Sequence, residues 1–147
     1  HGTKSIEYAK VIAIEGFDSR IACASSLYGR GTYFASQSCK SAQYGIKNGL
    51  HTKARAPRSL GTMIVSRVAL GDPYYTEGHY EGARAPSKEV FDNPDDEDDA
   101  RTIPCDSLIA KPGIQRKGGE QLHMEFVTFA PEQAYPEFIL RYVEEDD

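Results

Sequence analysis

The sequence lacks several features that would place a protein in other functional classes. It has no apolar run as long as a membrane span and no signal-peptide pattern, so we expect no membrane partner. Positive charge is also scarce, because 17 Lys and Arg residues face 22 Asp and Glu residues and the net charge is -5. Nucleic acids are bound through basic surfaces, so we expect no direct nucleic-acid binding by this segment.

Cysteine is scarce too, and its spacing excludes the common cysteine-based sites. Cys23, Cys39 and Cys105 are odd in number and far apart, with neither a CxxC pair nor a metal-ligand spacing. We expect reduced thiols in an intracellular protein, nuclear or cytoplasmic, and no metal site. The acidic run at 95–99 does not change this, because it lacks the ligand spacing and the glycine of an EF-hand loop.

The length and composition that remain predict one folded domain over residues 1–147. Hydrophobic residues make up 39% of the chain and charged residues 27%, which is enough apolar material for a modest core. From 74 to 119 regular pattern is lost, apart from a short strand at 105–109, and 133–137 reads as a turn. Elsewhere the periodicity predicts a helix and three strands, at 5–15, 63–70, 124–129 and 138–143.

The most informative stretch is residues 28–45. It predicts a tight turn at two glycines, a strand at 32–34, and a helix that begins after Ser36 and ends at Gly45. Ser41 and Tyr44 lie three apart on this helix and share a face, so with Tyr33 they can meet at one pocket. Two aromatic rings and a hydroxyl suit a flat ring that carries an amide. By residue type alone, the tyrosines fit ordinary half-buried core positions even better.

The strings at 31–35 and 40–44 resemble the catalytic signature of the poly(ADP-ribose) polymerase family. Further matches follow in the family's order, and the last resembles the tankyrase branch; they lie at 1–3 with 16–17, at 68–72, and at 125–127 with 133–137. The resemblance implies an α+β ADP-ribosyltransferase fold, with split and mostly antiparallel sheets and short helices. It also implies a truncated N-terminal side, because in the family the histidine equivalent to His1 ends a strand.

The resemblance implies roles for eight residues. His1 would bind the adenosine ribose of NAD, Tyr33 and Tyr44 would stack on the nicotinamide, and Glu125 would bind the ribose 2′-hydroxyl. Backbone groups of Gly2 and the Ser41 hydroxyl would hold the nicotinamide amide. The implied catalytic residues are His1, Tyr33 and Glu125, and the implied NAD-binding residues are Gly2, Thr3, Arg20, Ser41 and Tyr44. Arg20 also fits a solvated surface position.

The implied activity is the transfer of ADP-ribose from NAD to protein acceptors, with release of nicotinamide. NAD is consumed as a substrate, and no metal is needed. Glu125 precedes Gln133 by eight positions, as in polymerising members, so we expect elongation and poly(ADP-ribose) as a further partner. Members that transfer a single unit often carry an apolar residue in place of this glutamate. The loop at 109–121 is expected to be exposed and to choose the protein acceptor. Two alternatives remain, an NAD glycohydrolase and a catalytically silent module that binds NAD or ADP-ribose.

Overall fold

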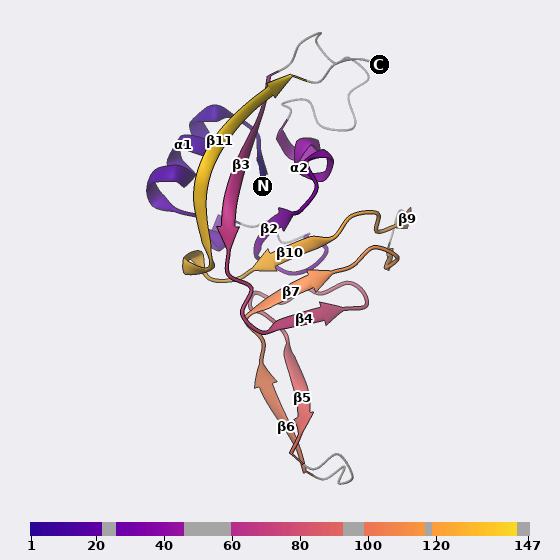
Figure 1. The fold of residues 1–147 in the computed structure, drawn as a ribbon. Coiled ribbons are helices and arrows are strands. Elements are labelled where there is room, and N and C mark those ends of the chain that lie inside the picture. Colours follow the sequence, from indigo (N-terminus) through magenta and orange to yellow (C-terminus); the bar gives the residue numbers. More distant parts are fainter. Residues whose placement is uncertain (22–25, 46–59, 93–98, 117–118, 144–147) are drawn as a thin grey trace.

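The computed structural model describes residues 1–21, 26–45, 60–92, 99–116 and 119–143. Within these ranges it has the predicted α+β architecture, with most strands paired antiparallel (Figure 1). The basic segment at 47–59 and most of the acidic run at 95–99 lie outside the described residues, as does Cys23. Among the helices that the structure describes, none has the length and apolar content needed to cross a membrane.

The first sheet is built on β3 (Leu60–Val68), which lies between β1 (Gly2–Thr3) and β11 (Ala134–Val143). Both neighbours run antiparallel to β3. The strand predicted at 63–70 is therefore confirmed as a central strand, although it begins and ends earlier along the chain. Its apolar residues contribute to the core through Ile64, which is 1% exposed, while Leu60 and Val65 remain exposed.

Helix α1 (Ile6–Glu15) packs on this sheet and matches the predicted helix. Ser5 caps its first turn, because the Ser5 hydroxyl accepts a hydrogen bond from the backbone N–H of Tyr8 at 3.3 Å. Gly16 ends the helix at a φ of 84°, which glycine adopts without strain. One core cluster forms beneath α1; its buried members are Ala9, Phe17, Phe34, Ile64 and Ala134.

The second sheet has the strand order β2-β10-β7-β4. All pairs are antiparallel except β4 with β7. The bounds are Thr32–Ala35 for β2, Glu125–Thr128 for β10, Ser107–Ala110 for β7 and Pro73–Thr76 for β4. Helix α2 (Ser38–Gly45) follows β2 directly, so the predicted strand and helix in this region are confirmed.

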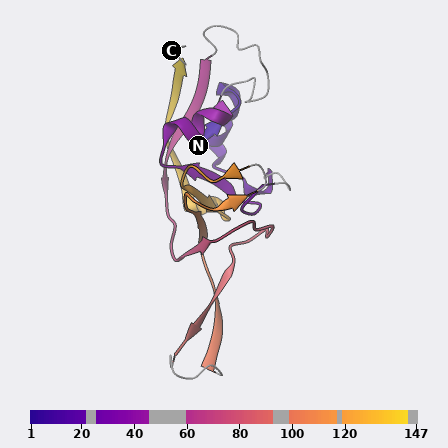
Figure 2. The ribbon, with the colours of Figure 1, turned by 90° about the vertical axis from the view of Figure 1, so that its right-hand side faces the viewer.

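The short strand predicted at 105–109 is confirmed as β7, whereas the loss of regular pattern predicted for the rest of 74–119 is wrong. Besides β4 and β7, this region forms a hairpin of β5 (Ser87–Phe91) and β6 (Ala100–Pro104), which projects away from the two main sheets (Figures 1 and 2). A small pair of β8 (Gln115–Arg116) and β9 (Gly119–Glu120) follows. The hairpin was missed because mixed polar and apolar residues alternate only weakly along a solvated two-stranded ribbon.

The turn predicted at 133–137 is also wrong in its position. The chain turns earlier, through the short helix η3 (Pro131–Gln133), and β11 already begins at Ala134. The Gln133 side chain explains the shift, because its Oε1 accepts hydrogen bonds from the backbone N–H groups of Phe129 at 3.0 Å and Ala130 at 2.9 Å. The Gln133 side chain thus stabilises a turn at 129–133, before β11 begins.

Candidate active site

Glu125 opens β10, where it lies between Ala35 of β2 and Ala110 of β7. Its side chain is buried, with the residue 4% exposed. Two donors reach the same carboxylate oxygen: Gln121 Nε2 lies 2.7 Å from Oε1 and Lys40 Nζ lies 3.1 Å from it. Among the described residues, both of these contacts are made to Oε1 and none is recorded at Oε2.

Lys40 is a site residue that the sequence analysis did not single out. It lies in the first turn of α2 and is buried with Glu125, so its ammonium compensates the buried carboxylate. The ammonium also donates to the Tyr44 hydroxyl at 3.4 Å and lies 5.3 Å from the centre of the Tyr44 ring. The spacing in the sequence could have indicated Lys40, because it lies four residues before Tyr44 and therefore on the same face of the helix.

Tyr33 shares the sheet face of Glu125. Val127 pairs with Tyr33 and Glu125 pairs with Ala35, so the two candidate residues are diagonal neighbours, with about 7–8 Å between such positions. The Tyr33 hydroxyl accepts from the Tyr28 N–H at 2.7 Å and donates to the Gly29 carbonyl at 2.9 Å. Burial and the nearby Glu125 charge raise the pKa of Tyr33, which therefore remains a neutral phenol near pH 7.

His1 lies beside β2 and contacts the backbone of Tyr33. Its Nδ1 is 2.7 Å from the Tyr33 carbonyl oxygen, and a carbonyl only accepts, so Nδ1 carries the proton. In the neutral ring Nε2 is then an acceptor. The imidazole is fixed between two aromatic rings, with centroids 5.3 Å from Phe17 and 5.7 Å from Phe34. His1 thus contacts Tyr33 of β2, and β2 pairs with β10, which carries Glu125.

Gly2 and Ser41 are also brought together, because β1 runs against α2. A Cβ atom on Gly2 would lie 1.8 Å from the Ser41 carbonyl oxygen, so only glycine permits this approach. Ser41 is buried in the helix, and Thr3 is buried where β1 pairs with Thr62 of β3. These three predicted NAD-binding residues therefore form one contiguous group.

The remaining two predicted NAD-binding residues differ from this group. Tyr44 is 55% exposed, which leaves its ring accessible at the surface above Lys40. Arg20 lies in η1 (Ser19–Ile21), where its side chain is 89% exposed and donates to both carboxylate oxygens of Asp18 at 2.9 and 2.8 Å. This pairing lowers the pKa of the Asp18 carboxyl. The structure places no other candidate residue in contact with Arg20 within the described part of the chain.

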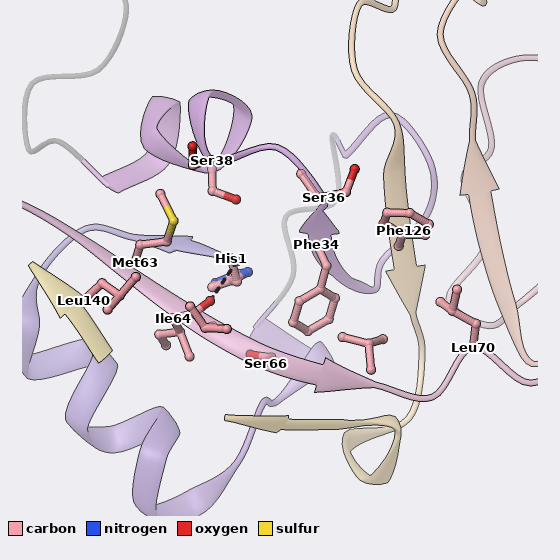
Figure 3. A pocket seen from close by; sticks show the side chains of 14 residues that line it. His1, Phe34, Ser36, Ser38, Met63, Ile64, Ser66, Leu70, Phe126 and Leu140 are labelled. Carbon is pink, nitrogen blue, oxygen red and sulfur yellow. Dashed lines mark hydrogen bonds between the residues drawn. The ribbon is translucent and has the colours of Figure 1, made fainter. Parts of the chain in front are cut away.

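A cavity of about 430 Å³ opens between β2, β3 and α2 (Figure 3). His1 and Ser41 line it, together with apolar side chains such as Phe34, Ile64 and Phe126. Tyr33, Tyr44 and Glu125 do not line this cavity. Of the three side chains predicted to meet at one pocket, only Ser41 is therefore found here. In the described residues, no group of three or more His, Cys, Asp or Glu side chains is arranged to hold a metal ion.

Comparison with known proteins places the chain in a family. The model of the poly(ADP-ribose) polymerase catalytic domain matches residues 1–144. The chain therefore belongs to the poly(ADP-ribose) polymerase catalytic domain family, which uses NAD as a substrate. This membership confirms the resemblance drawn from the sequence and supports ADP-ribosyl transfer.

Two curated relatives extend the comparison. The chain is 27% identical over 143 residues to the human protein mono-ADP-ribosyltransferase PARP12 and 29% identical over 144 residues to the mouse protein of the same name. Each match covers 97% of this chain but 16% of the relative, so the chain spans about a sixth of the length of these proteins. Both names describe mono-ADP-ribosyl transfer.

Proposed function

We propose that this domain transfers ADP-ribose from NAD to a protein side chain and releases nicotinamide. The observation that carries the proposal is the state of Glu125, a buried carboxylate held by two donors at Oε1 with Oε2 left for a ligand. Burying a charge is costly unless it is paired, so a paired and half-satisfied carboxylate at a family motif indicates a catalytic group.

The chemistry explains why such a carboxylate is needed. When nicotinamide leaves, positive charge develops on the ribose, as in the oxocarbenium-like transition state of glycoside cleavage. Oε2 of Glu125 would accept a hydrogen bond from the ribose 2′-hydroxyl and stabilise that charge. The same oxygen would orient the incoming acceptor group as a base. In this scheme Lys40 and Gln121 fix the carboxylate before the reaction begins.

The remaining residues would bind NAD. Nε2 of His1, which is an acceptor in the neutral ring, suits a ribose hydroxyl, while the exposed Tyr44 ring offers a face for stacking. Gly2 and Ser41 form the close contact between β1 and α2 and would hold the nicotinamide amide. A rigid pose of the nicotinamide ring would bring the glycosidic bond near its reactive geometry.

The length of the product separates two forms of this function. Elongation is favoured by Glu125, because its spacing to Gln133 matches polymerising members. Single transfer is favoured by the relatives, whose printed names describe mono-ADP-ribosylation. We propose single transfer as the basic activity, with elongation as the second form that Glu125 supports.

The test is incubation with labelled NAD, followed by a denaturing gel and a parallel assay for free nicotinamide. A sharp labelled band would support single transfer, and a ladder would support elongation. Nicotinamide released without labelled protein would replace the proposal with NAD hydrolysis, and binding without release would replace it with a silent binding module.

A matched pair of variants tests the role of Glu125. Glu125→Gln keeps the shape of the side chain and removes its charge, so it should slow nicotinamide release by at least about 100-fold. Glu120→Gln makes the same change at an exposed position in the same segment and should leave the rate within twofold. Equal rates for both variants would remove Glu125 from the mechanism.

A further inference from the structure

Gln121 is the most deeply buried amide near the candidate active site, with 1% of the residue exposed. Its Nε2 donates to Glu125 Oε1 at 2.7 Å and to the His123 carbonyl oxygen at 2.6 Å. Both partners are acceptors, so a reversed amide would set oxygen against oxygen. The orientation of the Gln121 amide is therefore fixed by its partners.

The backbone of Gln121 is fixed as well. Its N–H donates to the Ile114 carbonyl at 2.8 Å, and its carbonyl accepts from the Gly113 N–H at 2.9 Å. These two bonds close the segment between β7 and β10 at Gln121. The side chain then reaches from this segment to the Glu125 carboxylate, so the two donors on Oε1 come from different elements, Lys40 from α2 and Gln121 from the segment before β10.

The position is not optimal for stability. The Oε1 atom of Gln121 is buried and has no hydrogen-bond partner among the described residues. An unsatisfied buried acceptor is unfavourable, and an apolar side chain of similar length would avoid that loss. The hydrogen bonds of the Gln121 side chain are thus confined to its NH2 group, which donates to Glu125 and to the His123 carbonyl.

We propose that Gln121 is a positioning residue for ADP-ribosyl transfer. Together with Lys40 it holds Oε1 of Glu125, which fixes the rotation of the carboxylate and directs Oε2 to the ribose hydroxyl. Gln121 acts through Glu125 and touches no substrate. The inference rests on the function proposed above for Glu125, and it adds a residue outside the motifs that identified the family.

The first test is Gln121→Met, which keeps the length of the side chain and removes the amide, with Gln115→Met at an exposed position of the same loop as the control. Loss of a hydrogen bond to a charged group predicts a fall in kcat for nicotinamide release of about 10- to 100-fold. The KM for NAD should change less than about twofold, because positioning acts in the transition state. The melting temperature should fall, because Glu125 and the His123 carbonyl each lose a donor, and removal of the unsatisfied oxygen offsets only part of that loss.

A double-mutant cycle separates positioning from a structural role. If Gln121 acts only through the Glu125 charge, Gln121→Met should change single-turnover rates less than about twofold in a Glu125→Gln background. A fall of the same size in both backgrounds would overturn the inference. Gln121→Leu serves as a second apolar variant if Gln121→Met does not fold.

The outcomes also distinguish this inference from the proposed function. If the unaltered domain releases no nicotinamide from NAD, both are overturned. If it is active and Gln121→Met matches it in kcat, only the positioning role of Gln121 is overturned, and Glu125 keeps its proposed role.

Discussion

The buried ion pair of Lys40 and Glu125 makes a strong prediction for stability. Lys40→Met keeps the length of the side chain and removes the ammonium that lies 3.1 Å from Glu125 Oε1. Both side chains are buried, at 9% and 5% exposure, so water does not replace the lost partner. Removing one member of a buried pair typically costs about 3–5 kcal/mol, because an uncompensated charge stays behind.

The structure supplies a matched control in an exposed ion pair. Arg67 and Glu137 pair across β3 and β11, with the Arg67 side chain 79% exposed. Exposed pairs contribute about 0–1 kcal/mol, so Arg67→Met should change the free energy of unfolding by less than about 1 kcal/mol. The expected difference between the two variants is thus at least about 2 kcal/mol.

Urea unfolding followed by circular dichroism measures this difference. Adding Glu125→Gln to Lys40→Met removes the uncompensated charge, so the double variant should regain most of the lost free energy of unfolding. Equal losses for Lys40→Met and Arg67→Met, or no restoration in the double variant, would refute the view that the pair is a buried one whose charges compensate each other.

Two further predictions follow from contacts at β1. Gly2→Ala would place a Cβ atom 1.8 Å from the Ser41 carbonyl oxygen, so it should displace α2 and weaken NAD binding in calorimetry by at least about tenfold, whereas Gly78→Ala enters open space and should not. In a polypeptide that begins with His1, burial lowers the pKa of the α-amino group from 8.0 to about 6. The folded state then binds fewer protons than the unfolded state between these values, so stability should rise by about 2 kcal/mol from pH 6 to pH 8. N-terminal acetylation should abolish that part of the pH dependence in urea unfolding, and an unchanged slope would contradict the assignment.

Much of the fold could be predicted from local pattern. The apolar periodicity of α1 and the β-branched run of β3 each identify an element whose interactions lie within or directly beside it. The strand and helix at 32–45 were predictable for the same reason. By contrast, β4 is a strand because it pairs in parallel with β7, about thirty residues further along the chain. The local sequence of β4 does not indicate this distant partner, so the strand could not be predicted.

The candidate site shows the same division. Glu125, Tyr33 and His1 could be proposed because they lie in short motifs, and in the structure they lie on or beside the paired strands β2 and β10. Lys40 and Gln121 were missed because their role depends on where the Glu125 carboxylate lies in three dimensions. A buried lysine and a buried glutamine look like surface residues in a sequence, since both types are usually exposed.

The short strand β10 is held at both ends by glutamine side chains. A slip of one residue in its pairing would exchange the faces of Glu125 and Phe126, moving the carboxylate to the face that packs on the core beneath α1. Gln121 holds the Glu125 end, while Gln133 holds the other end through the N–H groups of Phe129 and Ala130. Two side-chain amides thus hold the two ends of β10, in addition to the pairing of its four residues with β2 and β7.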